Sequence, residues 1–266
     1  MDEKKDIRKG DGGRGKGQGE GGISVIGIGP GSEAHLTGRA REALAGSGCV
    51  VGYTRYVDLI KALIPGKEVY VSGMTFEAER CEKAIALARR GKRVAVVSSG
   101  DAGIYGMAGL VMQLAMNDGG APLDIEVIPG VPAFVASAAL LGAPLMHDFA
   151  SISLSDLLTP WAKIEERVEA AAKADFVMIL YNPRSSKRKD GLARALDIVA
   201  GYRRPQTPVG LVRNAARQGE EAVVTTIAGF AHYYEKVDML SIVIIGNAET
   251  FASGGRMITP RGYKIT

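Results

Sequence analysis

Short apolar runs alternate with amphipathic segments along the first half of the chain. The runs are rich in Val and Ile, as strands are, and apolar residues recur at helical spacing in the segments between them. Strands are expected at 23–29, 48–53, 68–72, 93–99 and 125–130, and helices at 40–48, 55–64, 76–91 and 107–119. Strand, small-residue turn and helix in repetition are typical of a parallel α/β sheet. The first half is therefore predicted to be an α/β domain.

The second half shows a different succession of strands and helices. Strands are expected at 176–182, 208–214, 222–228 and 241–247, and helices at 161–174 and 189–202. The TTIAG segment resembles a hairpin turn, which indicates a mixed sheet rather than a purely parallel one. The fold class is thus α/β with two α/β domains, expected at 23–130 and 131–266.

Residues 1–22 are charged and glycine-rich, and we expect a disordered tail there because they offer little apolar surface to bury. No run approaches the roughly 18 apolar residues of a membrane span, so no membrane association and a cytoplasmic location are expected.

Composition narrows the function. The formal net charge is only +4, which does not indicate the dense basic stripe of a nucleic-acid-binding protein and better suits a small anionic ligand. The two cysteines, Cys49 and Cys81, have neither zinc-site nor disulfide-framework spacing. A reducing compartment and no metal site are expected.

Four loops follow strand ends, where open α/β sheets bind ligands. They are GIGPGSEAHLT (27–37), SSGDAGIYG (98–106), PGVPA (129–133) and YNPRSSKR (181–188).

The first loop does not fit a dinucleotide. Ser32 stands where the G-x-G-x-x-G fingerprint needs its last glycine, and Pro30 removes a backbone donor. The second strand also ends without the acid that would bind a ribose. NAD and the common Rossmann-type methyltransferases are therefore disfavoured, no P-loop motif occurs, and a plain strand-to-helix turn stays open.

The second loop places one acid, Asp101, among glycines. Glycines let the backbone approach a ligand closely, and the carboxylate suits a ligand that carries positive charge. The other interpretation is an Asx-type turn that caps the helix beginning near Ile104.

Taken in order, GIGPGSEAHLT, SSGDAGIYG, VIPGVPA, YNPRS and TPRGY resemble the tetrapyrrole methylases of cobalamin synthesis over residues 23–266. GYTRY (52–56) and HDFASISLSDLLTPW (147–161) are most similar to the members that methylate C17 of precorrin-3B, or of its cobalt counterpart, and contract the ring. The resemblance implies two α/β domains of the class III methyltransferase type, with S-adenosyl-L-methionine in the cleft between them, and a homodimer.

The resemblance also implies the residues that contact the cofactor. They are Pro30, Ser99, Gly100, Asp101, Ile104, Pro132, Ala133, Asn182 and Ala215. Many relatives have Thr-Ala where this chain has Pro132 and Ala133, so a hydroxyl contact of those enzymes is not expected here.

The small-molecule substrate, a tetrapyrrole, carries acetate and propionate arms, which arginine binds in two-pronged fashion. The substrate-binding candidates are Arg55, Tyr56, Arg184, Arg213 and Arg261, with Lys187 and Arg188 beside them. His147 and Asp148 are the candidates for acid–base catalysis of ring contraction, and a structural His–Asp hydrogen bond is the alternative. A sister methylase for another position, and a tetrapyrrole carrier without chemistry, remain open.

Overall fold

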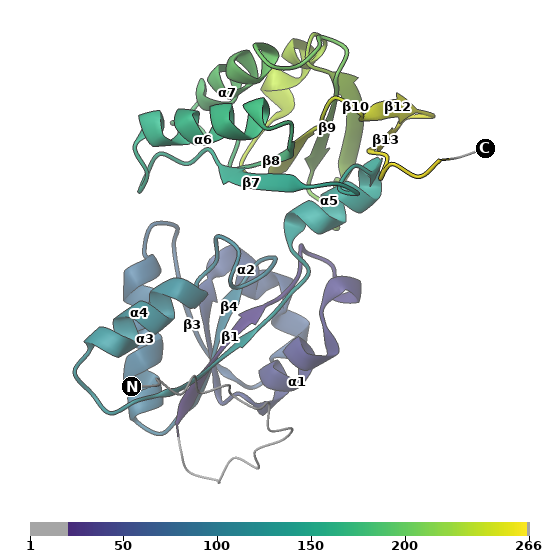
Figure 1. Ribbon diagram of the computed structural model, residues 1–266. Coiled ribbons are helices and arrows are strands. Elements are labelled where there is room, and N and C mark those ends of the chain that lie inside the picture. The colour runs from purple at the N-terminus through teal and green to yellow at the C-terminus, as the bar shows by residue number, and fades with distance from the viewer. Residues whose placement is uncertain (1–20, 265–266) are drawn as a thin grey trace, which may run out of the picture.

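The computed structural model describes residues 21–264. The predicted tail falls almost entirely outside these residues, except that Gly22 is already the first residue of β1. Two five-stranded sheets follow one another along the chain and lie one above the other in Figure 1, the N-terminal one below. The division at residue 130 falls between the two sheets, in the loop before α5, and as a domain boundary it stays a prediction.

The N-terminal sheet is parallel throughout, as its pattern predicts. Its order is β3-β2-β4-β1-β5. The strands are β1 (Gly22–Gly27), β2 (Cys49–Tyr53), β3 (Glu68–Ser72), β4 (Arg93–Ser98) and β5 (Asp124–Ile128). The helices are α1 (Gly38–Gly46), α2 (Thr54–Leu59), α3 (Glu77–Arg89) and α4 (Ala108–Asn117), with the 3-10 turns η1 (Glu33–His35) and η2 (Lys61–Leu63).

Both faces of this sheet are covered, which explains its nearly continuous apolar strands. Residues of α3 and α4 pack with Val25 and Val96 on one face. Residues of α1 and α2 pack with Ile26 and Val97 on the other. Parallel strands buried on both sides present all their carboxyl ends at one edge, where the predicted loops lie.

The C-terminal sheet is mixed, in the order β10-β9-β11-β8-β7. Its strands are β7 (Phe149–Ser153), β8 (Val177–Tyr181), β9 (Pro208–Arg213), β10 (Glu221–Thr226) and β11 (Ser241–Ile245). Only β7 and β8 run parallel, and the other pairs are antiparallel. The helices α6 (Trp161–Lys173) and α7 (Gly191–Ala200), with the 3-10 segment η3 (Phe230–Lys236), cover one face of the sheet.

The other face is covered by α5 (Ala133–Leu141), whose Phe134 and Leu141 pack against Ile179 and Val212. A small third sheet lies beside it, made of β6 (Gly142–Ala143), β12 (Phe251–Ser253) and β13 (Arg256–Ile258), and the apolar pattern does not predict it. Its strands are two or three residues long, which is too short for a period to show.

Helix α5 links the two halves. It begins right after the last loop of the N-terminal half, and its body lies against the C-terminal sheet (Figure 1). Between residues 21 and 264, no helix combines the length and apolarity needed to cross a membrane.

Candidate functional site

A cleft lies between the two halves, at the carboxyl ends of the N-terminal strands. It encloses about 820 Å³, counted with its open mouth. It is lined by Pro30, Tyr56, Ser99, Gly100, Asp101, Ile104, Tyr105, Ala133, Tyr181, Asn182, Asn214, Ala215, Arg217, Met239, Leu240, Ser241 and Ile242. A concave site at the carboxyl ends of parallel strands is where α/β proteins bind small molecules and cofactors.

Three glycine loops form the N-terminal wall and touch backbone to backbone. The amide of Gly100 donates to the carbonyl of Gly29 at 2.7 Å, and the amide of Gly29 donates back at 3.0 Å. A methyl group on Gly27 would lie 2.6 Å from the amide nitrogen of Gly130 and 2.7 Å from the carbonyl oxygen of Gly100. No side chain fits between these loops, so glycine is required there.

Asp101 fastens two of these loops together. Its Oδ1 accepts from the amide of Gly103 at 2.8 Å, and its Oδ2 accepts from the amide of Gly130 at 3.0 Å. The Asx-type turn of the second interpretation is therefore present, but it caps no helix, because α4 begins only at Ala108. Asp101 also lines the cleft. The same carboxylate thus shapes the loop and adds negative charge to the wall.

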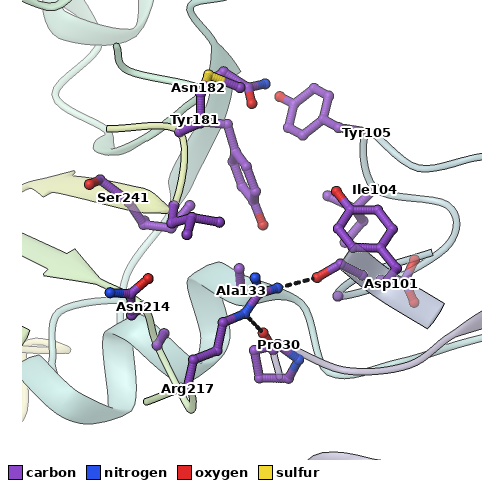
Figure 2. Close-up of a pocket in the computed structure, with 17 residues that line it drawn as sticks. Pro30, Asp101, Ile104, Tyr105, Ala133, Tyr181, Asn182, Asn214, Arg217 and Ser241 are labelled. Carbon is purple, nitrogen blue, oxygen red and sulfur yellow. Dashed lines mark hydrogen bonds between the residues drawn. The ribbon is translucent and has the colours of Figure 1, made fainter. Parts of the chain in front are cut away.

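Tyrosines from both halves meet across the cleft. Tyr105 donates its hydroxyl to the carbonyl of Ser151 at 2.9 Å, and its ring lies 5.0 Å from that of Tyr181. Figure 2 shows the Tyr181 side chain extending from its strand end into the space between Ser241 and Asp101. Burial raises the pKa of Tyr181 to about 12, and burial also raises the pKa of Tyr56, so both phenols stay neutral hydrogen-bond donors at physiological pH.

Backbone strain gathers around the cleft. Among residues 21–264, six residues other than glycine have a positive φ, and three of them line the cleft: Tyr105 (52°), Asn182 (51°) and Asn214 (54°). A fourth, Ala216 (58°), lies in the turn after β9 that carries Arg217. Such a conformation costs on the order of 1 kcal/mol at Tyr105 and Ala216, whereas asparagine tolerates it.

Arg217 reaches across the cleft from the C-terminal half. Its Nε donates to the carbonyl of Pro30 at 2.6 Å, and its Nη2 donates to the hydroxyl of Ser99 at 2.7 Å (Figure 2). Its side chain lies so close to Gly31 that a Cβ there would collide with it. Burial lowers the pKa of this guanidinium below its usual value.

The structure brings most of the predicted cofactor residues to this one cleft. Pro30, Ser99, Gly100, Asp101, Ile104, Ala133, Asn182 and Ala215 line it. Pro132 is not among the lining residues and serves as the N-cap residue of α5. The contacts these residues make with a ligand stay predictions.

The predicted substrate arginines have other surroundings. Arg184 pairs with Glu235 at 2.9 Å, Arg188 with Asp156 at 3.7 Å, and Arg213 with Asp238 at 2.8 Å. Arg55, Lys187 and Arg261 are exposed. Of the substrate-binding candidates only Tyr56 lines the cleft, and the role of each stays a prediction.

His147 and Asp148 are exposed, at 54% and 83% of their side-chain surfaces, and lie outside the cleft lining. The Nδ1 of His147 accepts from the backbone amide of Asp148 at 2.9 Å. The Nδ1 of His147 lies 4.0 Å from Oδ2 of Asp148, so the structural His–Asp hydrogen bond of the alternative interpretation is not formed. Residues 21–264 contain no cluster of His, Cys, Asp or Glu able to hold a metal ion.

The lining residues that were not predicted include Tyr181, Asn214, Arg217, Met239, Leu240, Ser241 and Ile242. Tyr181 could have been found, since it directly precedes Asn182 at a strand end. Nothing in the sequence indicates Arg217, because its distance from Pro30 depends on how the halves meet.

Comparison with known proteins agrees with this geometry. The family described as Tetrapyrrole (Corrin/Porphyrin) Methylases matches residues 22–231. A probable cobalt-factor III C(17)-methyltransferase of Salmonella typhimurium is 55% identical, over 91% of this chain and 100% of that protein. The cobalt-factor III methyltransferase of Priestia megaterium is 49% identical over 91% of this chain, which covers 45% of that longer protein.

A solved structure is similar over nearly the same length. The crystal structure of the methyltransferase CobJ superposes with a TM-score of 0.85 at 36% identity, and the match covers 90% of this chain and 100% of that one. With a family match over most of its length and glycine loops that meet at a cleft between its two halves, this chain belongs to the tetrapyrrole methylase family.

Proposed function

We propose that this protein transfers a methyl group from S-adenosyl-L-methionine to C17 of cobalt-factor III, with contraction of the ring, in cobalamin biosynthesis. The observation that carries the proposal is the 55% identity, over its full length, to a protein described as a probable cobalt-factor III C(17)-methyltransferase. The cobalt ion is part of the substrate.

The chemistry of the cleft fits the methyl donor. Main-chain loops without side chains allow close approach, the Asp101 carboxylate favours positive charge, and the Tyr181 ring offers a flat apolar wall. Pro30, Gly100, Asp101, Ala133, Asn182 and Ala215 are the residues we assign to holding it.

S-adenosyl-L-methionine supplies an electrophilic methyl group on a sulfonium. The chain's own contribution is to position the two reactants. No His or Lys is among the described residues that line the cleft, and the buried tyrosines stay protonated. Holding two reactants in attack geometry accounts for much of the rate of such displacements. The strained, hydrogen-bonded loops provide a rigid frame for it.

Ring contraction needs a proton placed on or taken from the substrate. His147 and Asp148 stay the predicted acid–base pair, supported by their adjacency before β7 and their exposure to an incoming substrate. The predicted arginines would bind the acidic arms, and Arg184 would first have to exchange Glu235 for a substrate carboxylate.

A product assay tests the proposal. The purified protein is incubated with S-adenosyl-L-methionine and, in parallel, with cobalt-factor III or with metal-free precorrin-3B; mass spectrometry counts the methyl groups added, and carbon NMR locates them and shows whether the ring has contracted. A methylated, ring-contracted product from the cobalt form is expected. A product methylated at another carbon would instead show a sister methylase.

A carrier without chemistry would behave differently towards the donor product. Titration calorimetry with S-adenosylhomocysteine is expected to give a dissociation constant in the micromolar range. Absence of binding at 1 mM, a free energy of only about −4 kcal/mol, would contradict the enzyme and favour the carrier.

The homodimer and the cytoplasmic location are part of the same proposal: the first rests on the family resemblance, and the second on the absence of a long apolar run and on the spacing of the two cysteines. Light scattering of the purified full chain measures the first. Fractionation of the producing cell measures the second.

A further inference from the structure

We infer that Arg217 binds a carboxylate of the ligand held in the cleft and so ties that ligand to both halves of the molecule. This inference rests on the proposed function, because both the methyl donor and the tetrapyrrole carry carboxylates. Arg217 belongs to none of the motifs that carry the family resemblance.

The first argument is charge. The buried guanidiniums of Arg80 and Arg203 have acidic partners: Arg80 lies 3.4 Å from Glu77, and Arg203 lies 3.1 Å from Asp175. Arg217 is partly buried and is hydrogen-bonded only to a carbonyl and a hydroxyl oxygen, and no carboxylate of residues 21–264 lies within ion-pair distance of it. Withdrawing a cation from water without a counter-ion is costly, and an anionic ligand would reduce that cost.

The second argument is the donor inventory. A guanidinium has five N–H groups, and within the described part of the chain Arg217 uses one on Nε and one on Nη2. The remaining donors belong to a side chain that lines the cleft, so they are available to a ligand there. Carboxylate is the group that such a fork binds in two-pronged fashion.

The third argument is the electrostatic surrounding. Arg55 lies near enough to lower the pKa of Arg217 further, and the nearby Tyr56 is held neutral by burial. This side of the cleft is therefore positive, whereas Asp101 contributes negative charge to the wall. A ligand with separate cationic and carboxylate groups matches both.

The fourth argument is the way in which the turn that carries Arg217 is held in place. The turn 214–220 contains Asn214 and Ala216 at positive φ, and it is held by the Glu220 carboxylate, which accepts from the amide of Ala216 at 2.6 Å. The Asn214 side chain donates to the carbonyl of Gly219 at 3.1 Å. Strain fixed in this way at a ligand cleft indicates a side chain held for binding.

The test separates the two sources of the carboxylate. Calorimetry measures binding of S-adenosylhomocysteine, and of its analogue that lacks the carboxylate, to the wild-type chain and to Arg217→Gln. If the donor supplies the carboxylate, the variant loses about 10- to 100-fold in affinity for S-adenosylhomocysteine and little for the analogue. If the tetrapyrrole supplies it, both affinities are retained and the KM for cobalt-factor III rises at least 10-fold.

Two results would overturn the inference. Equal losses for both donor analogues would show that Arg217 only latches the halves together, and unchanged affinities with unchanged KM would show that it binds no carboxylate. Should Arg217→Gln fail to fold, Arg217→Lys keeps the charge without the fork and is expected to show the same selective loss, smaller in size. Arg41→Gln is the control. It removes an ion pair to Glu33 within the N-terminal half and is expected to bind S-adenosylhomocysteine as the wild type does.

These outcomes are distinct from failure of the proposed function. If no methyl transfer occurs but the carboxylate still governs the affinity of S-adenosylhomocysteine through Arg217, the inference stands and the assigned reaction falls. If transfer occurs without any role for Arg217, the reverse holds.

Discussion

The two halves of the molecule build the cleft in different ways. The N-terminal half presents main chain: its parallel strands end in loops where Gly27, Gly100 and Gly130 touch. The C-terminal half presents side chains from a mixed sheet, among them Tyr181, Asn182 and Arg217. The frame of the site therefore depends on glycine in one half, whereas the other half contributes mainly side chains.

The largest effect on stability is expected where the backbones of the glycine loops approach each other most closely. In Gly130→Ala the new methyl group would lie 2.6 Å from the carbonyl oxygen of Gly27 and closer still to that of Gly100. Backbone atoms cannot move aside as a flexible side chain does, so the free energy of unfolding should fall by about 3 kcal/mol. Urea denaturation measures it.

Gly109→Ala in α4 is the matched control, because a Cβ there meets nothing within 4 Å. It is expected to be neutral or to stabilise by about 0.5–1 kcal/mol. Similar losses in both variants would show that the close packing of the glycine loops is unimportant.

Asp101→Ala comes next. Two backbone donors, on Gly103 and Gly130, lose their acceptor, and the cleft loses a negative charge. The affinity for S-adenosylhomocysteine should fall by roughly 1–3 kcal/mol, measured by calorimetry. Asp118→Ala removes a comparable turn contact, to Gly120, far from the cleft and should not change the affinity. Wild-type affinity in the Asp101 variant would remove Asp101 from the site.

Tyr181 allows a smaller test by pH. Its pKa is raised from about 10 in the unfolded chain to about 12 in the folded one, so its contribution to stability is complete below pH 10 and is lost as the pH rises towards 12. Between pH 9 and 11, wild type should lose about 1 kcal/mol more unfolding free energy than Tyr181→Phe. Parallel curves for the two proteins would contradict the burial of this phenol.

The smallest effect is expected from His147→Ala on the affinity for S-adenosylhomocysteine. The side chain is exposed and lies outside the cleft lining, so the Kd for S-adenosylhomocysteine should stay within about twofold of wild type. The rate of contracted product then decides the proposed acid–base role: a fall of about 100-fold or more supports it, and a wild-type rate removes it.

The sequence predicts the N-terminal half well for a physical reason. Parallel strands that are buried on both faces have unbroken apolar sequences. The loops after them contain the glycines without which the backbones could not approach each other so closely. Nine strands, β1–β5 and β8–β11, lie at or near their expected positions, and the 55–64 helix is divided into α2 and η2. Strand β7 (Phe149–Ser153) was not among the expected strands.

The C-terminal contribution to the site could be predicted only in part. Asn182 and Ala215 follow strand ends and carry the family motifs, so sequence alone indicates them. Arg217 follows the same strand, yet its importance comes from the carbonyl of Pro30, 187 positions earlier in the chain. A contact of that range depends on how the halves dock, which no local pattern encodes.

Helix α5 has a mechanical consequence. Its body is packed against the C-terminal sheet, whereas its first residue, Ala133, has its amide 3.5 Å from where a Cβ on Gly100 would lie. Any rotation of the C-terminal half that widened the cleft for a bulky macrocycle would move Ala133 with that half, and so change the wall beside Gly100 at the same time. Both changes would then depend on the same short segment, between Ile128 and Ala133.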